Sequence, residues 1–249
     1  MTSTTMMSVE DCAGVVAEFF VSVYARIDEW RAAIEAYTSA RNGTVARSGI
    51  DSLVETSVAK DLADHRLPIV GAGFVAAPGF VPDAEWHLAW WLGDANTFGV
   101  GTERPGIRRL ETVEDPSSDR FRDYTTLEWW RVPRKTGRRH ITGPYVDYLC
   151  TDEYTLTLTV PVYSGGEMIG VAGADLYVKD AERALLPPLR SVGPDTTLVN
   201  ASGRVLVSTN PHVATGSVVR NASPLQDGSG SVPCGDTGLF MFGSRQGMR

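Results

Sequence analysis

The chain has 249 residues, of which 43% are hydrophobic and 21% are charged, as in an ordinary soluble globular protein. Its net charge of −7 argues against general nucleic-acid binding, which needs a surplus of lysine and arginine against phosphate. The sequence has neither a secretion-type leader nor an apolar run long enough to cross a membrane, so we expect a cytoplasmic protein with no membrane partner.

The first forty residues predict one long helix. Ser8 and Asp11 have the spacing of a capping box, and Asn42 with Gly43 is a good stop signal. A seven-residue apolar repeat runs through the helix at Val9, Val16, Val23, Trp30 and Tyr37. Such a repeat fits a helix packed along its own domain, or a seam that pairs with a second subunit in a homodimer.

A second amphipathic helix is predicted from Ile50 to His65, and a further one around Ser118 to Trp130. The rest of the chain changes to short runs rich in β-branched and aromatic residues, separated by turn signals, which are typical of strands. The predicted strands lie within 67–77, 87–94, 154–163, 168–178, 196–202, 204–209 and 238–242. Thr155 to Val160 alternates threonine with leucine or valine, which predicts a strand with one wetter face.

These elements predict an α+β protein in three parts. Residues 1–65 form an N-terminal helical region, and residues 66–220 form a domain built on an antiparallel sheet with flanking helices. Residues 221–249 form a tail rich in glycine and serine, with a possible last strand.

Motifs for catalysis, metals and cofactors are weak in this sequence. Gly71-x-Gly73-x-x-Ala76 has the outline of a dinucleotide fingerprint, but Pro78 and Pro82 oppose the helix that must follow, so a glycine-rich strand is predicted instead. The histidines share no metal-ligand spacing. The three cysteines (Cys12, Cys150 and Cys234) lie far apart in the sequence, which favours reduced and mostly buried thiols. We therefore predict no catalytic residue, no metal and no cofactor.

A basic run from Arg131 to His140 stands out in this acidic chain. The simplest interpretation is a solvated loop. The alternatives are that it borders a site for anions or docks an acidic protein partner. The polar segment from Gly101 to Gly143 contains this run and is long for a connection, so it is also a candidate lid over a ligand.

Aromatic and acidic residues together predict a ligand site. Trp129 and Trp130 precede Tyr145 and Asp147, and Asp175 interrupts an otherwise apolar strand, where a carboxylate is costly unless it is paired or hydrogen-bonded. Two carboxylates beside aromatic rings suit an ammonium group, because the acids supply charge-assisted hydrogen bonds and the rings supply cation–π attraction.

The same residues resemble the Cache family, the PAS-like sensor domains of bacterial chemoreceptors and kinases. The resemblance rests on Trp129-Trp130, on Gly-Pro-Tyr145-Val-Asp147 and on the run from Gly165 to Asp175, within roughly 67–211. It implies a PAS-like antiparallel sheet flanked by helices behind a long N-terminal helix, with the ligand held between the sheet and its covering loops.

The resemblance also implies which half of an amino-acid site is kept. Tyr145, Asp147 and Asp175 match the part that holds the ammonium group. The position of the family's carboxylate-binding arginine is Leu127, and that of its tyrosine is Arg122. Arg122 or Arg131 could replace the missing function, or the ligand could lack an α-carboxylate.

Together these features predict a stand-alone sensor that binds an amine-containing metabolite or an amino acid and signals through an unknown protein partner or an oligomer. Three alternatives stay open at this point. The site could hold a small organic acid through its arginines, or the chain could be an enzyme on a small amine or acid with Asp147 or Asp175 as a base. The chain could also be an interaction subunit whose pocket is vestigial.

Overall fold

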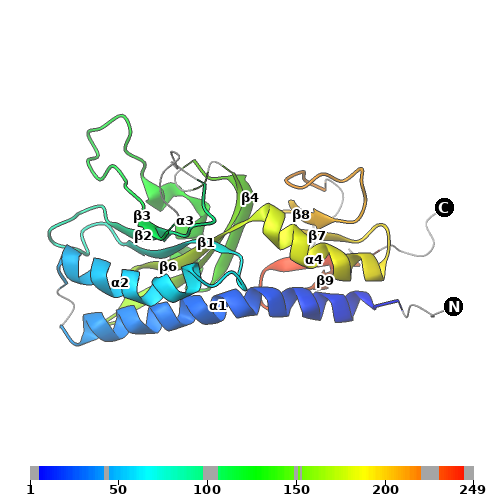
Figure 1. Cartoon of the computed structure of the whole chain (residues 1–249), viewed down its shortest axis with the longest axis horizontal. Helices are drawn as coiled ribbons and strands as arrows, with labels where there is room; N and C mark the ends of the chain where they lie inside the picture. The colour runs from blue at the N-terminus through cyan, green and yellow to red at the C-terminus, as the bar shows by residue number, and fades with distance from the viewer. Residues whose placement is uncertain are drawn as a thin grey trace. The chain divides into compact units, whose positions relative to one another are not determined.

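The computed structural model describes residues 6–41, 45–97, 106–148, 151, 153–219 and 230–243. Within these ranges the chain forms four α-helices, one short 3₁₀ helix and ten strands, the predicted α+β class (Figure 1). It divides into two compact units. The larger unit comprises 23–142 and 146–177, and the smaller unit comprises 1–22, 143–145 and 178–249.

The larger unit is built on a six-stranded sheet with the order β3-β2-β1-β6-β5-β4. Its strands are β1 (Ile69–Ala76), β2 (Leu88–Leu92), β3 (Arg108–Arg109), β4 (His140–Val146), β5 (Tyr154–Ser164) and β6 (Glu167–Tyr177). β1 and β6 lie at the centre and pair antiparallel along nearly their whole length. The side chains of these two strands therefore lie at the middle of each face of the sheet.

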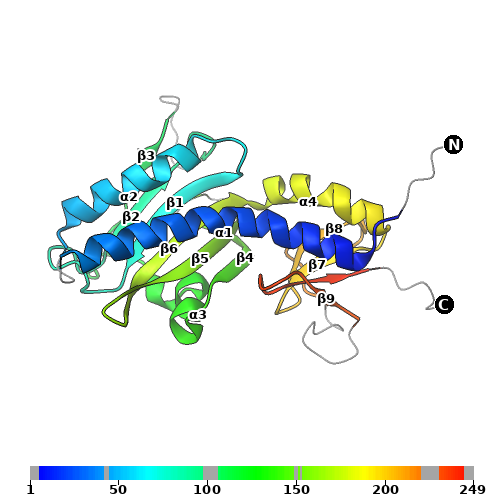
Figure 2. The ribbon, with the colours of Figure 1, turned by 90° about the horizontal axis from the view of Figure 1, so that it is seen from below.

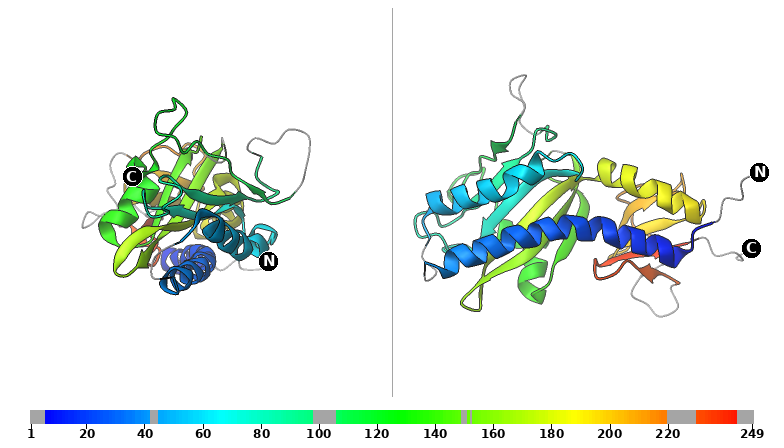
Figure 3. Two further views of the ribbon diagram at one scale, coloured as in Figure 1. Left: turned by 90° about the vertical axis from the view of Figure 1, so that its left-hand side faces the viewer. Right: turned by 60° about the horizontal axis from the view of Figure 1, so that its bottom comes forward.

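Helices cover the two faces of this sheet differently. α2 (Arg47–Leu62) and the part of α1 (Val9–Ser39) from Val23 onward lie on one face, as the view from below shows (Figure 2). The opposite face carries the 3₁₀ helix Tyr124–Thr126 and α3 (Glu128–Thr136), which contacts β5 and β6 (Figure 3). We call the first the helical face. We call the second the ligand face, after the binding site that the sequence predicts.

The smaller unit contains a four-stranded sheet with the order β8-β7-β10-β9. Its elements after β6 are α4 (Val178–Val192), β7 (Thr197–Asn200), β8 (Val205–Ser208), β9 (Val232–Pro233) and β10 (Leu239–Phe242). Cys12 and Cys234 are buried free thiols in this unit, as predicted, and burial raises the pKa of Cys234 to about 12. Cys150 lies outside the described residues.

Several elements match the prediction closely. The glycine-rich run around Gly71 is a strand, and the long first helix begins where expected, with the Ser8 hydroxyl accepting from the Asp11 amide at 3.0 Å and donating to the Asp11 carboxylate at 2.8 Å. The stop signal at Asn42 and Gly43 lies outside the described residues. None of the helices in the described ranges is both long and apolar enough to span a membrane.

Two expectations need correction. The helix predicted over Ser118 to Trp130 is instead α3, which begins at Glu128 and continues through Pro133. The threonine face of β5 is not wet, because Thr155, Thr157 and Thr159 are all buried and hydrogen-bonded. The predicted domain 66–220 stays a prediction, and the strands after Tyr177 within it form a separate sheet.

The seven-residue repeat of α1 is used within the chain. Val16, Val23 and Trp30 are buried, and the Trp30 indole Nε1 donates to the buried Asp61 carboxylate at 3.0 Å. The repeat therefore gives no support to a homodimer, which stays a prediction without an observation behind it. The large apolar residues that α1 leaves exposed are Val15 and Val21.

Candidate ligand-binding site

Asp175 occupies the centre of the ligand face. It lies on β6, directly opposite Gly71 of β1 and Thr157 of β5, and its side chain is 1% exposed. The Thr157 hydroxyl donates to Asp175 Oδ1 at 2.6 Å, whereas Oδ2 has no hydrogen-bond partner among the described residues. Because a buried carboxylate oxygen without a donor is costly, this atom is the clearest candidate for a ligand contact.

The protonation of Asp175 depends on this environment. Burial raises the pKa of Asp175 well above its usual value, and the negative charge of Asp147 raises it further, while the hydrogen bond from Thr157 works in the opposite direction. Asp147 follows β4 and is itself buried, so the structure brings together the two predicted carboxylates. A cation bound between them would relieve both the burial cost and their mutual repulsion.

A third side chain, Trp90, lies beside the Asp175 carboxylate, and the sequence did not predict it. Trp90 lies on β2 opposite Gly73, and its buried indole extends across β1 over a surface without side chains. A Cβ atom at Gly71 would lie 2.9 Å from Trp90 Nε1 and 3.3 Å from Asp175 Oδ2, and one at Gly173 would lie 3.4 Å from the far edge of the indole. The glycines thus allow the indole to lie flat beside the carboxylate.

The predicted pair Trp129 and Trp130 is buried, at the start of α3 and not at the end of a helix. Both rings belong to an aromatic cluster centred on Tyr124, which stacks on Trp129 with 6.2 Å between ring centroids and meets Trp130 at 5.4 Å. Trp130 Nε1 has no hydrogen-bond partner among the described residues, and neither has the buried hydroxyl of Thr142. Both are therefore further candidates for ligand contacts.

Pro133 explains how α3 is attached to the sheet. Proline has no N–H, so the carbonyl of Trp129, four residues earlier, receives no donor from within the helix. The hydroxyl of Thr159 on β5 donates to this carbonyl instead, at 2.8 Å. Pro133 therefore leaves a carbonyl of α3 free to accept a hydrogen bond from β5. This hydrogen bond from Thr159 holds Trp129 over the ligand face.

The remaining predicted residues are Tyr145, Arg122 and Arg131. Tyr145 is a half-buried residue of β4 that clusters with the smaller unit. Arg122 is exposed, and its guanidinium donates to the carbonyls of Asp119 and Phe121. Arg131 is an exposed residue of α3, so the first part of the basic run is a solvated helix surface.

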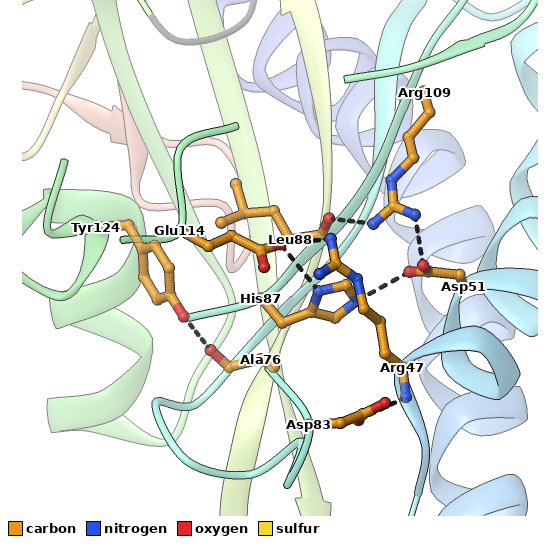
Figure 4. A network of polar contacts seen from close by, with 9 residues as sticks. All are labelled: Arg47, Asp51, Ala76, Asp83, His87, Leu88, Arg109, Glu114 and Tyr124. Atoms are coloured by element: carbon orange, nitrogen blue, oxygen red, sulfur yellow. Dashed lines mark hydrogen bonds and ion pairs between the residues drawn. The ribbon is translucent and has the colours of Figure 1, made fainter. Parts of the chain in front are cut away.

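The helical face carries a charged network that sequence analysis did not predict (Figure 4). His87, fully buried just before β2, has its Nε2 2.8 Å from Asp51 Oδ1 and its Nδ1 3.3 Å from Glu114 Oε1. Arg109 contacts the other oxygen of Asp51, and Arg47 donates to Glu114 at 2.9 Å. The residues come from four separate segments, which is why no spacing in the sequence signals them.

This network has a clear electrostatic effect on Asp51. Partial burial works to raise its pKa, but hydrogen bonds from His87 and Arg109 outweigh this and hold the pKa of Asp51 below its usual value. The network therefore ties α2 to the edge of the sheet through ionised groups.

The comparisons with known proteins agree with this architecture. Residues 106–182 match the family model described as a methyl-accepting chemotaxis protein-like first PDC sensor domain. Among solved structures, a protein titled methyl-accepting chemotaxis protein X has a TM-score of 0.51 and 21% identity over 85% of this chain and 77% of its own. The fold is that of a Cache, or PDC, sensor domain.

Two further structures share this Cache fold. The ligand-binding domain of the Pseudomonas aeruginosa amino acid chemoreceptor PctC, solved in complex with GABA, has a TM-score of 0.51 and 16% identity over 92% of this chain and 93% of its own. The extracellular domain of the putative histidine kinase mmHK1S-Z2 has a TM-score of 0.54 and 14% identity, covering 84% and 74%. No curated protein is significantly similar to the chain. These matches confirm the Cache-like fold that the resemblance predicted.

Proposed function

We propose that this Cache domain senses a small metabolite that carries a protonated amine, held by Asp175 and Asp147 on the ligand face. The observation that carries the proposal is the buried Asp175, whose Oδ2 lacks a donor while a second buried acid raises its pKa. An ammonium group supplies both a donor and a compensating charge. The GABA complex of PctC, a neighbour in fold, supports an amine-containing ligand.

The test is calorimetry of the purified protein against small amines, amino acids and dicarboxylates. We expect amines to bind and Asp175→Asn to weaken them at least tenfold, because the variant removes a desolvated charge partner worth about 2–5 kcal/mol. Asp61→Asn is the matched control, since Asp61 is also a buried acid but lies on α2, where it accepts a hydrogen bond from the Trp30 indole. Tight binding of a dicarboxylate that Asp175→Asn leaves unchanged would contradict the proposal.

The alternative of an organic acid held by arginines has less support. Arg122 and Arg131 are exposed, and Arg122 is already bonded to carbonyls of its own loop. The enzyme alternative also has less support, because the family match and the structural neighbours are sensor domains. Placement in the cytoplasm, a protein partner for the output and action as a stand-alone protein stay predictions from the sequence.

A further inference from the structure

The ligand face has a hydrogen-bond donor that the amine proposal does not use. Trp90 is 4% exposed and its indole Nε1 has no hydrogen-bond partner among the described residues. An indole N–H only donates, so an ammonium group cannot satisfy it. A buried donor of this kind normally has an acceptor, because leaving it unpaired costs free energy.

The position of this donor links it to Asp175. β1 lies between β2, which carries Trp90, and β6, which carries Asp175. The two side chains are diagonal neighbours across Gly71 and Gly73, and both approach the point that a Cβ of residue 71 would occupy. A donor and a carboxylate oxygen, each without a hydrogen-bond partner among the described residues, therefore lie side by side.

We propose that Trp90 is a specificity-determining residue, and that the ligand carries a hydroxyl next to its amine. A hydroxyl accepts from Trp90 Nε1 and can also donate to Asp175 Oδ2, whereas a methyl group at the same place leaves the indole unpaired. This inference rests on the proposed function, in which the ligand carries an amine. It adds that the second polar group of the ligand is a neutral oxygen next to that amine. It places Trp90 in direct contact with the ligand.

Two pairs of probes of nearly equal shape test this inference. The first pair is 2-aminoethanol and propylamine, and the second is L-serine and L-2-aminobutyrate, so that each pair differs by a hydroxyl in place of a methyl. We expect the wild-type protein to prefer the hydroxyl member of at least one pair by about tenfold or more, because sites built around a hydroxyl discriminate strongly against analogues without it. Calorimetry or ligand-observed NMR titration gives the ratio.

The variant that decides the question is Trp90→Phe, which keeps an aromatic ring and removes the N–H. The hydroxyl preference should fall to within about twofold, since the N–H donor is lost, whereas the smaller ring affects both members of a probe pair alike. Trp91→Phe is the matched control, because Trp91 is the next residue of β2, is equally buried and lies on the helical face, where the Arg109 guanidinium is 5.6 Å from its ring centroid. This control should keep the preference.

The ratio within each variant is insensitive to a general loss of stability, and thermal melting confirms that each variant is folded. If the amines bind without a hydroxyl preference, or if Trp90→Phe keeps the preference, the inference is wrong and the amine function stands. If none of the four probes binds the wild-type protein at millimolar concentration, both the inference and the amine function are wrong.

Discussion

The raised pKa of Asp175 predicts that binding of the proposed amine is linked to protons. Burial and the charge of Asp147 raise this pKa, so the free protein holds the carboxyl protonated at pH values where an exposed aspartate is ionised. An ammonium group pairs with the ionised carboxylate. Binding of the proposed amine should therefore lower the pKa of Asp175 and release its proton.

This gives a testable pH dependence for an amine such as 2-aminoethanol. Its affinity should increase as the pH is raised from 5 toward the raised pKa of Asp175, because less work is then needed to ionise the carboxyl. Calorimetry in phosphate and in MOPS, a buffer with a different ionisation enthalpy and no primary amine, measures the protons released at the same pH, and Asp175→Asn should release none. A flat pH profile with no proton release would show that Asp175 is already ionised or does not meet the amine.

At the scale of elements, α3 depends on a bond that Pro133 makes necessary. Thr159→Val removes the hydroxyl that donates to Trp129 O and should lower the free energy of unfolding by about 1–2 kcal/mol, since the buried carbonyl is left without a donor. In a Pro133→Ala background the helix can supply its own N–H, so the same change should cost less. Urea unfolding of the four proteins measures the coupling, and equal costs in both backgrounds would refute this account.

The attachment of α2 to the sheet depends on the network around His87. Asp51→Ala should lower the free energy of unfolding by about 2 kcal/mol or more, because it leaves the buried His87 and the half-exposed Arg109 without their shared partner. Glu55→Ala on the exposed side of the same helix is the control and should change stability by about 0.5 kcal/mol or less.

The same contacts predict how stability depends on acid. The folded-state pKa of Asp51 is below its usual value, so its contribution is complete above about pH 4 and is lost as the pH falls through the folded-state pKa. Thermal melts of the wild-type protein and Asp51→Ala should therefore converge as the pH is lowered below about 4. A constant difference down to pH 2 would mean that the charge of Asp51 contributes little.

The sequence predicts the elements of this protein better than its site. Strong periodicity identifies α1 and the glycine-rich strands, and the acids Asp147 and Asp175 are visible because each is a charge in an apolar context. Trp90 could not be found in this way, because a tryptophan in an apolar strand is indistinguishable from core. It becomes significant only through Gly71, Gly73 and Gly173, which lie on other strands and meet it through the sheet register.

At the scale of the whole molecule, α1 has residues in both compact units. Because the apolar repeat of α1 is buried, we expect folding to depend on which side of this helix is substituted. Val16→Glu with Val23→Glu places two charges in fully buried positions and should abolish folding, as seen by circular dichroism. Val15→Glu with Val21→Glu alters residues that are 38% and 47% exposed and should leave the protein folded.

The second double variant also tests the predicted homodimer. If α1 pairs with a second copy, the exposed Val15 and Val21 are the apolar residues it offers, and light scattering should show the Val15→Glu, Val21→Glu protein as a monomer beside a dimeric wild type. If the wild-type protein is already monomeric, the predicted homodimer is ruled out.

The part of β1 without side chains under the Trp90 indole has a consequence for the evolution of this protein. A methyl group at Gly73 would lie 2.1 Å from a backbone atom of β2, which cannot move away, whereas one at Gly71 would meet the side chains of Trp90 and Asp175. Position 71 can therefore change only together with its neighbours. Among related sequences, we expect residues 71 and 90 to covary, so that alanine or larger at 71 accompanies a residue smaller than tryptophan at 90, and such lineages should have exchanged one ligand for another.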